Sequence, residues 1–224
     1  MSRRAAALLA VAILVAGAIT AVVVIHQGGS RSVAQTMKAA GCTYRDVAPY
    51  PPKDAATRNN YHDDFPTLSA KPHWSTFPPS AGGHYRLWAV WGFYRKAVNP
   101  AMVVHNEEHG GVVIWWGPNV PRSTVSQLER FYAEQPVGVF GTPIAGLGAK
   151  IALTAWTADP AWKGDEGLAF IHHDYGMGHI AICSQFDQKA FAAFRNAYRG
   201  QSPQGFPLAA DRPGCGPETS CPVS

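Results

Sequence analysis

An uncharged apolar stretch at residues 5–25 constrains this chain most, because it decides on which side of a membrane the rest can fold. As a helix, this stretch would extend about 31 Å, enough to cross the hydrocarbon core of a bilayer. Arg3 and Arg4 precede it and favour the cytoplasmic side. The sequence therefore predicts an N-terminal transmembrane helix that sends everything after His26 outside the cytoplasm.

A cleaved signal peptide is the alternative for this stretch, because Ala16-Gly17-Ala18 has the small-x-small pattern of a cleavage site. The apolar run nevertheless continues through residues 19–25, which favours an uncleaved, single-pass anchor in the cell membrane. Both interpretations place the following domain outside the cytoplasm. The expected organisation is a cytoplasmic stub and anchor at residues 1–27, a linker at 28–40, one domain at 41–210, and a cysteine-containing tail at 211–224.

Composition supports a single folded domain after the anchor and argues against a nucleic-acid partner. The length is sufficient for a full hydrophobic core. Charged residues make up only 15% of the chain, the formal net charge is +4, and no cluster of Lys or Arg occurs. A nucleic-acid-binding domain normally shows a basic patch or stripe. The membrane, through the N-terminal helix, and envelope proteins are the partners that remain.

Four cysteines, Cys42, Cys183, Cys215 and Cys221, bear on the redox setting of the domain. An even number outside the cytoplasm indicates two disulfides, with three possible connectivities. Cys215 and Cys221 close a short loop, and we expect them to pair. Cys42 and Cys183 would then tie the start of the domain to its end. The chain has no Cys-x-x-Cys motif, which disfavours dithiol redox chemistry.

Hydrophobic patterning predicts an α+β domain with a mostly antiparallel sheet and two packed helices. Residues 41–83 and 137–149 are expected to be loop or connector, because they are rich in Pro or Gly. One helix should begin with a capping box at Thr124-x-x-Gln127, and a second should be capped by Asp187. Strands are expected at residues 86–94, 101–105, 111–116 and 150–157, with weaker candidates at 168–172 and 179–183.

Two imidazoles and two carboxylates lie between apolar runs in the segment from Val103 to Ile114. His105 and His109 are four residues apart, with Glu108 beside them, and His84 follows a Gly-rich approach. If these side chains converge, three imidazoles would face one point with a carboxylate behind them, a pattern typical of a metal centre. Imidazole ligands suit several metals, and outside the cytoplasm copper and zinc are the expected ones. The predicted ligands are His84, His105, His109 and Glu108.

Other interpretations of the same residues remain open. In a buried polar turn, His105 and His109 would hydrogen-bond carboxylates and backbone and pin two strands together. The pattern His-x-x-Glu-His also matches the inverted zinc-peptidase motif, in which the glutamate is the base acting on zinc-bound water. That chemistry needs a sustained helix, whereas β-favouring residues flank this segment. The second hypothesis after metal binding, ahead of this hydrolase, is a non-catalytic envelope module. It would bind a protein or glycan partner through tryptophans, namely Trp74, Trp88, Trp91, Trp115 and Trp116.

A second histidine cluster lies at residues 171–179 and includes His172, His173 and His179. Adjacent histidines on a strand point to opposite faces, so His172 and His173 cannot easily share a metal. The sequence favours a solvated turn between two strands here.

Three blocks of this chain resemble a family of bacterial exported proteins catalogued as domain of unknown function 3105. Pro78-Pro79-Ser80-Ala81-Gly82-Gly83-His84 is similar to that family's Pro-Pro-Thr-Ser-Gly-x-His, and Trp91-Gly92-Phe93-Tyr94 to its Trp-x-x-Gly-x-Tyr. The segment from Val104 to Val113 is similar to its Val-His-Asn-Leu-Glu-His-Gly-Gly-Val-Val core. The likeness covers roughly residues 41–205.

The chain departs from this family pattern at two points. Glu107 stands where the family usually has leucine, which adds a carboxylate beside the histidine cluster, and the proline block is one residue longer before His84. The resemblance implies an anchored or exported single domain and supplies no activity. From the chemistry of the residues we therefore expect a membrane-anchored extracytoplasmic protein that binds copper or zinc. The sequence favours a non-catalytic role and leaves enzymatic activity open.

Overall fold

The computed structural model describes residues 32–49, 67, 69, 73–158 and 176–203. The chain divides into the units Met1–Ser32 and Val33–Ser224, and all elements named below belong to the second unit. None of the helices in the described residues has the length and hydrophobicity that a bilayer crossing requires. The apolar stretch at 5–25 and the tail cysteines lie outside the described residues, so the anchor and the Cys215–Cys221 pairing stay predictions.

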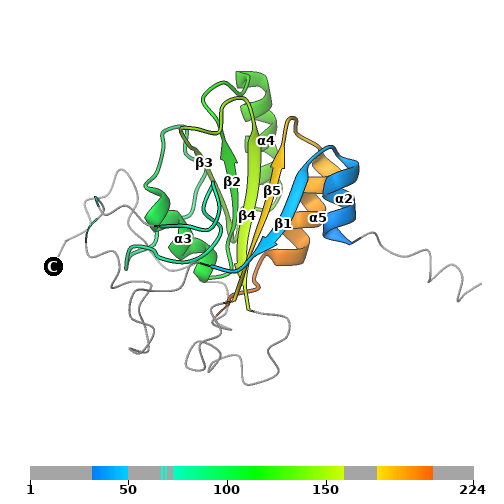
Figure 1. Cartoon of the computed structure of the whole chain (residues 1–224). Coiled ribbons are helices and arrows are strands. Elements are labelled where there is room, and N and C mark those ends of the chain that lie inside the picture. The colour runs from blue at the N-terminus through cyan, green and yellow to red at the C-terminus, as the bar shows by residue number, and fades with distance from the viewer. Residues whose placement is uncertain (1–31, 50–66, 68, 70–72, 159–175, 204–224) are drawn as a thin grey trace, which may run out of the picture. The chain divides into compact units, whose positions relative to one another are not determined.

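Five strands form one mixed, mostly antiparallel sheet in the order β1-β5-β4-β2-β3 (Figure 1). Every neighbouring pair is antiparallel except β2 and β3, which run parallel. A parallel pair needs a crossover connection, and α4 (Arg122–Glu134) provides it. The strands are β1 (Thr43–Val47), β2 (Val112–Trp116), β3 (Val139–Pro143), β4 (Ile151–Thr157) and β5 (Met177–Cys183).

Helices cover both faces of the sheet, as Figure 1 shows. On one face, α2 (Val33–Ala39), α4 and α5 (Gln188–Tyr198) pack with alternate strand residues such as Ile114. On the other face, α3 (Pro100–Glu108) and the irregular segment before it pack with Val113 and Trp115. Burial on both faces explains why β2 is an uninterrupted apolar run and does not alternate with polar residues.

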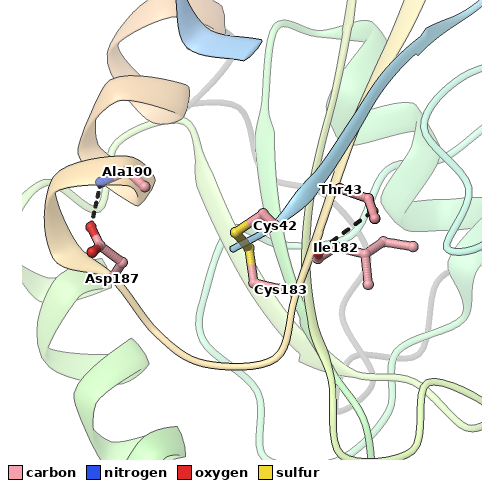
Figure 2. Close-up of a disulfide and its surroundings, with 6 residues drawn as sticks. All are labelled: Cys42, Thr43, Ile182, Cys183, Asp187 and Ala190. Carbon is pink, nitrogen blue, oxygen red and sulfur yellow. Dashed lines mark hydrogen bonds between the residues drawn. A yellow bond between two sulfur atoms is a disulfide. The ribbon is translucent and has the colours of Figure 1, made fainter. Parts of the chain in front are cut away.

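The expected α+β class is confirmed, and so are the two amphipathic helices. Asp187 caps α5, because its Oδ1 accepts a hydrogen bond from the Ala190 N–H at 2.8 Å (Figure 2). Phe191 and Phe194 on that helix are fully buried. The capping box predicted for α4 is wrong: the helix begins at Arg122, so Thr124 lies within its first turn, and no side chain caps it.

The strand predicted at residues 101–105 is wrong, because these residues belong to α3. Asn99 starts the helix, since its side chain accepts a hydrogen bond from the Ala101 N–H at 2.9 Å, and Pro100 occupies the first turn. All residues from Ala101 to Glu108 are buried. A helix surrounded by protein has no polar face, so its sequence lacks the amphipathic period by which helices are recognised. The β-branched valines of α3 therefore favoured the prediction of a strand.

Other local predictions also failed in the described residues. Residues 86–94 form no strand and make one isolated bridge, from Phe93 to Gly141. The predicted connector at 137–149 contains β3, the predicted linker at 28–40 contains α2, and the loop predicted at 41–83 contains β1. These elements are short and take their stability from pairing and packing, which local sequence does not encode. The structure has four helices in its described part instead of two.

The predicted disulfide between Cys42 and Cys183 is confirmed (Figure 2). It joins residues 141 positions apart, immediately before β1 and at the end of β5. The next cross-strand pair is Thr43 with Ile182, and the Thr43 hydroxyl donates to the Ile182 carbonyl at 3.5 Å. A disulfide of this kind indicates a domain outside the cytoplasm.

Candidate metal centre

Helix α3 supplies three of the four predicted ligand residues from its last turn. His105 and Glu108 are three residues apart, and His109 follows as the C-terminal cap. Residues three and four apart share one side of a helix, so these side chains lie next to each other. The Nε2 atoms of His105 and His109 are 2.9 Å apart, and their rings stack with centroids 4.8 Å apart.

His84 reaches the same point from the loop that precedes α3. The loop is held to the helix by a hydrogen bond from the Tyr85 N–H to the Ala101 carbonyl at 3.0 Å. The Nε2 of His84 is 3.1 Å from Oε2 of Glu108, and the same oxygen is 3.7 Å from Nε2 of His105. Ligand atoms of these three residues all lie within 4.8 Å of one another, which is close enough to hold one metal ion.

Backbone carbonyls fix which nitrogen of two imidazoles carries a hydrogen. Nδ1 of His84 is 2.8 Å from the Gly82 carbonyl, and Nδ1 of His105 is 2.8 Å from the Tyr85 carbonyl. A carbonyl only accepts, so each Nδ1 donates, and in the neutral ring each Nε2 then presents a lone pair. Both Nε2 atoms face the Glu108 carboxylate. The three groups together could hold a cation at this point.

The site is enclosed by protein. The side chains of His84, His105 and Glu108 are at most 5% exposed. Trp88, which is partly buried, lies against the rings of His105 and His109 with centroids 5.3 and 5.0 Å away. Trp156 from β4 packs edge-on against His84, with ring centroids 5.8 Å apart. Low exposure strengthens electrostatic attraction to a cation, because little water competes.

Two residues that the sequence interpretation did not single out hold this arrangement together. Asn106 exchanges two hydrogen bonds with the backbone of Ala89, at 3.0 and 2.9 Å, and so fastens the segment carrying Trp88 to α3. The Ser202 hydroxyl donates to the Glu108 carbonyl at 2.7 Å. Asn106 lies within the His-Asn-x-Glu-His block, so its position in the sequence could have identified it as part of the site. No local sequence pattern identifies Ser202.

Glu107 does not join the cluster, contrary to the sequence expectation of an extra carboxylate beside the site. Its side chain points to the sheet, where the Thr154 hydroxyl donates to Oε1, and Thr154 in turn accepts from the Trp115 indole at 2.7 Å. Oε2 has no partner among the described residues. Complete burial raises the pKa of Glu107 well above its ordinary value, which favours the neutral acid.

The other predicted site residues have different outcomes. His179 lies buried in β5, so it is not part of a solvated turn. His172 and His173 lie outside the described residues. Of the tryptophans proposed as partner contacts, Trp115 and Trp116 are buried in the core, so these two cannot act as surface contacts. Trp74, Trp88 and Trp91 are partly buried.

Comparison with known proteins identifies one family. The family described as "Protein of unknown function (DUF3105)" matches residues 69–210, more than half of the chain. The match includes the loop that carries His84 and the whole of α3. No curated protein and no solved structure was found to match this chain.

Proposed function

Since this chain belongs to the DUF3105 family, whose description assigns no activity, we propose its function from the site alone: it binds a transition metal ion through His84, His105 and Glu108. His109 completes the ligand set from the end of α3. The disulfide-linked domain is proposed to act outside the cytoplasm, anchored to the cell membrane by residues 5–25. Acquisition or delivery of a metal in the envelope, or support of a redox assembly there, is the corresponding role.

One observation carries this proposal, namely the convergence of the Glu108 carboxylate with two imidazole nitrogens whose rings are oriented from behind. The carbonyls of Gly82 and Tyr85 hold two imidazoles with Nε2 forward. Hydrogen bonds of this type orient histidine ligands and raise their basicity in metal proteins. With Nδ1 held by these carbonyls, both Nε2 atoms are directed toward the Glu108 carboxylate, at 3.1 and 3.7 Å, which is the arrangement that a shared cation requires.

The donor set favours zinc or copper over magnesium or calcium. Imidazole nitrogens suit zinc and copper, whereas magnesium and calcium prefer oxygen ligands. Two or three imidazoles with one carboxylate match the ligands of known zinc sites, which bond at about 2.0–2.2 Å. Small inward movements of these side chains would bring them to that distance around a shared ion.

Metal analysis of the full chain, purified in detergent because of its apolar N-terminal stretch, tests the proposal. We expect close to one zinc or copper ion per chain after desalting. His105→Ala and Glu108→Ala should each lose it, whereas His73→Ala, at an exposed histidine, should retain it. Substoichiometric metal in the unaltered chain, or equal metal in all variants, would eliminate the proposal.

A zinc-dependent hydrolase is the second candidate, and one observation favours it. His105, Glu108 and His109 lie at the end of a helix, so the expected β context that argued against the His-x-x-Glu-His motif is wrong. In that mechanism Glu108 would act as base on a zinc-bound water. Its position 3.1 Å from Nε2 of His84 and its burial favour a ligand role instead. Hydrolysis of a peptide or ester that is abolished in Glu108→Gln, with zinc retained, would establish the second candidate.

A further inference from the structure

A second group of polar side chains meets on the face of the sheet opposite α3. Asp46 in β1 and His179 in β5 are direct cross-strand partners, so their side chains share one face. Tyr44 lies two residues before Asp46 and therefore on the same face. Tyr198 is the last residue of α5, which covers this face. We call these four residues the tyrosine cluster.

The donor atoms of the tyrosine cluster converge closely. Oδ1 of Asp46 is 2.6 Å from Nδ1 of His179. The Tyr44 hydroxyl donates to the same carboxylate oxygen at 2.5 Å, lies 3.4 Å from Nδ1 of His179, and hydrogen-bonds the Tyr198 hydroxyl. The Tyr198 ring stacks on the His179 ring with centroids 4.0 Å apart. Three oxygens and one nitrogen thus surround one small region.

One ring nitrogen of His179, Nδ1, faces that region. Nε2 of His179 lies 2.9 Å from the Thr157 hydroxyl, so that nitrogen is engaged away from the cluster. Nδ1 is the ring nitrogen that faces the Asp46 carboxylate and the Tyr44 hydroxyl, and it is the one available to bind an ion there.

We propose that the tyrosine cluster is a second metal site, distinct from the one on α3, and that it binds ferric iron. Burial raises the pKa of Tyr44 and Tyr198, so both are neutral phenols until an ion displaces their protons. With those protons displaced, two phenolates and one carboxylate would provide three negative charges, which match a trivalent ion, and His179 adds one nitrogen. Hard oxygen ligands select hard cations, whereas the imidazole-rich site on α3 suits zinc and copper. Binding releases the two phenolic protons to solvent.

Access and rigidity both suit ion binding at this place. The Asp46 side chain is 50% exposed while that of His179 is 8% exposed, so an ion can enter from solvent past the carboxylate. The Cys42–Cys183 disulfide lies at the start of β1, two residues before Tyr44. It holds β1 against β5 and thereby fixes the separation of Asp46 and His179 before an ion arrives.

Titration of the full chain with ferric nitrilotriacetate tests this proposal. Phenolate coordination to ferric iron produces a visible charge-transfer absorption, so we expect a coloured complex with one iron per cluster. Tyr44→Phe and Tyr198→Phe should each weaken the absorption, and the double variant should abolish it. Tyr132→Phe is the matched control, because that partly buried tyrosine packs against the same face and lies outside the cluster. The control should retain the full absorption.

Two further variants separate this site from the other and guard against misfolding. His105→Ala should lose the zinc or copper on α3 and keep the ferric absorption. Asp46→Ala alters a half-exposed side chain and should weaken ferric affinity at least about tenfold. Absence of the absorption in the unaltered chain, its persistence in the double variant, or unchanged affinity in Asp46→Ala would each overturn the proposal.

Discussion

Glu107 and Glu108 are adjacent in sequence, yet they lie in different chemical environments. Glu108 faces two imidazoles, whereas Glu107 faces the sheet and receives one hydrogen bond from Thr154. The helix separates them, because consecutive residues are about 100° apart around its axis. Burial makes the charged form of Glu107 unfavourable, and its pKa is raised for that reason.

The raised pKa of Glu107 predicts a pH dependence of stability with a definite sign. The folded chain keeps the proton at a pH where the unfolded chain has lost it, so the free energy of unfolding should fall as pH rises above about 4.3. Glu107→Leu should remove this dependence. We expect similar stability to the unaltered chain near pH 5 and a gain of roughly 1–3 kcal/mol at pH 8, measured by denaturant unfolding with chelator present.

Glu107→Gln provides the control for this prediction, since it keeps the size of the side chain and removes its ionisation. The free energy of unfolding of Glu107→Gln should stay constant over the pH range in which that of the unaltered chain falls. An equally steep pH dependence in both variants would show that another group is responsible.

At the scale of elements, α3 is the part of the fold on which the α3 metal site depends most. It brings His105, Glu108 and His109 together only if the chain turns into a helix directly after Asn99. Gly111, just beyond, must lack a side chain, because a Cβ there would lie 2.6 Å from the Asn106 carbonyl oxygen. The start and the end of this helix are therefore tightly specified, although its middle resembles a strand.

Removing helix caps should distinguish α3 from α5. Asn99→Ala and Asp187→Ala each delete one side-chain hydrogen bond to a helix N–H, and each should lower the free energy of unfolding by about 1 kcal/mol. Only Asn99→Ala should also weaken zinc or copper binding, measured by competition with a chromogenic chelator. Equal metal affinity in the two variants would mean that α3 is held in place without its cap.

For the molecule as a whole, the two candidate sites lie on opposite faces of the same sheet. The α3 face carries the imidazole cluster, and the α5 face carries the tyrosine cluster and the larger group of apolar side chains. The disulfide joins the start of the edge strand β1 to the end of its neighbour β5. It should therefore affect the two sites differently.

The double variant Cys42→Ala/Cys183→Ala should test that difference. Loss of a cross-link over 141 residues should lower the free energy of unfolding by about 2–5 kcal/mol. Because β1 would be freed at the sheet edge, ferric binding should weaken more than zinc or copper binding on α3. Calorimetry gives the stability, and metal titrations give the two affinities. Equal weakening at both sites would argue that the disulfide acts only on global stability.

The sequence by itself determined the elements that have one face in water or lie in uninterrupted apolar runs. Phe191 and Phe194 recur at helical spacing because α5 is amphipathic, and the apolar runs of β2 and β4 could be recognised by their composition. Cysteine content and the apolar N-terminal stretch also sufficed to predict the disulfide between Cys42 and Cys183. The residue types of the α3 site, two histidines and a glutamate within five positions, were visible too.

Only the tertiary structure decided that residues 101–105 are helical and that His84 meets them. A helix buried on all sides loses the polar–apolar period from which helices are recognised, so Val103 and Val104 favoured the wrong element. The approach of His84 to Glu108, and of Asp46 to His179, depends on contacts between segments far apart in the chain. Local propensity contains no information about such contacts, because their free energy arises only when the whole sheet and its two layers of packing have formed.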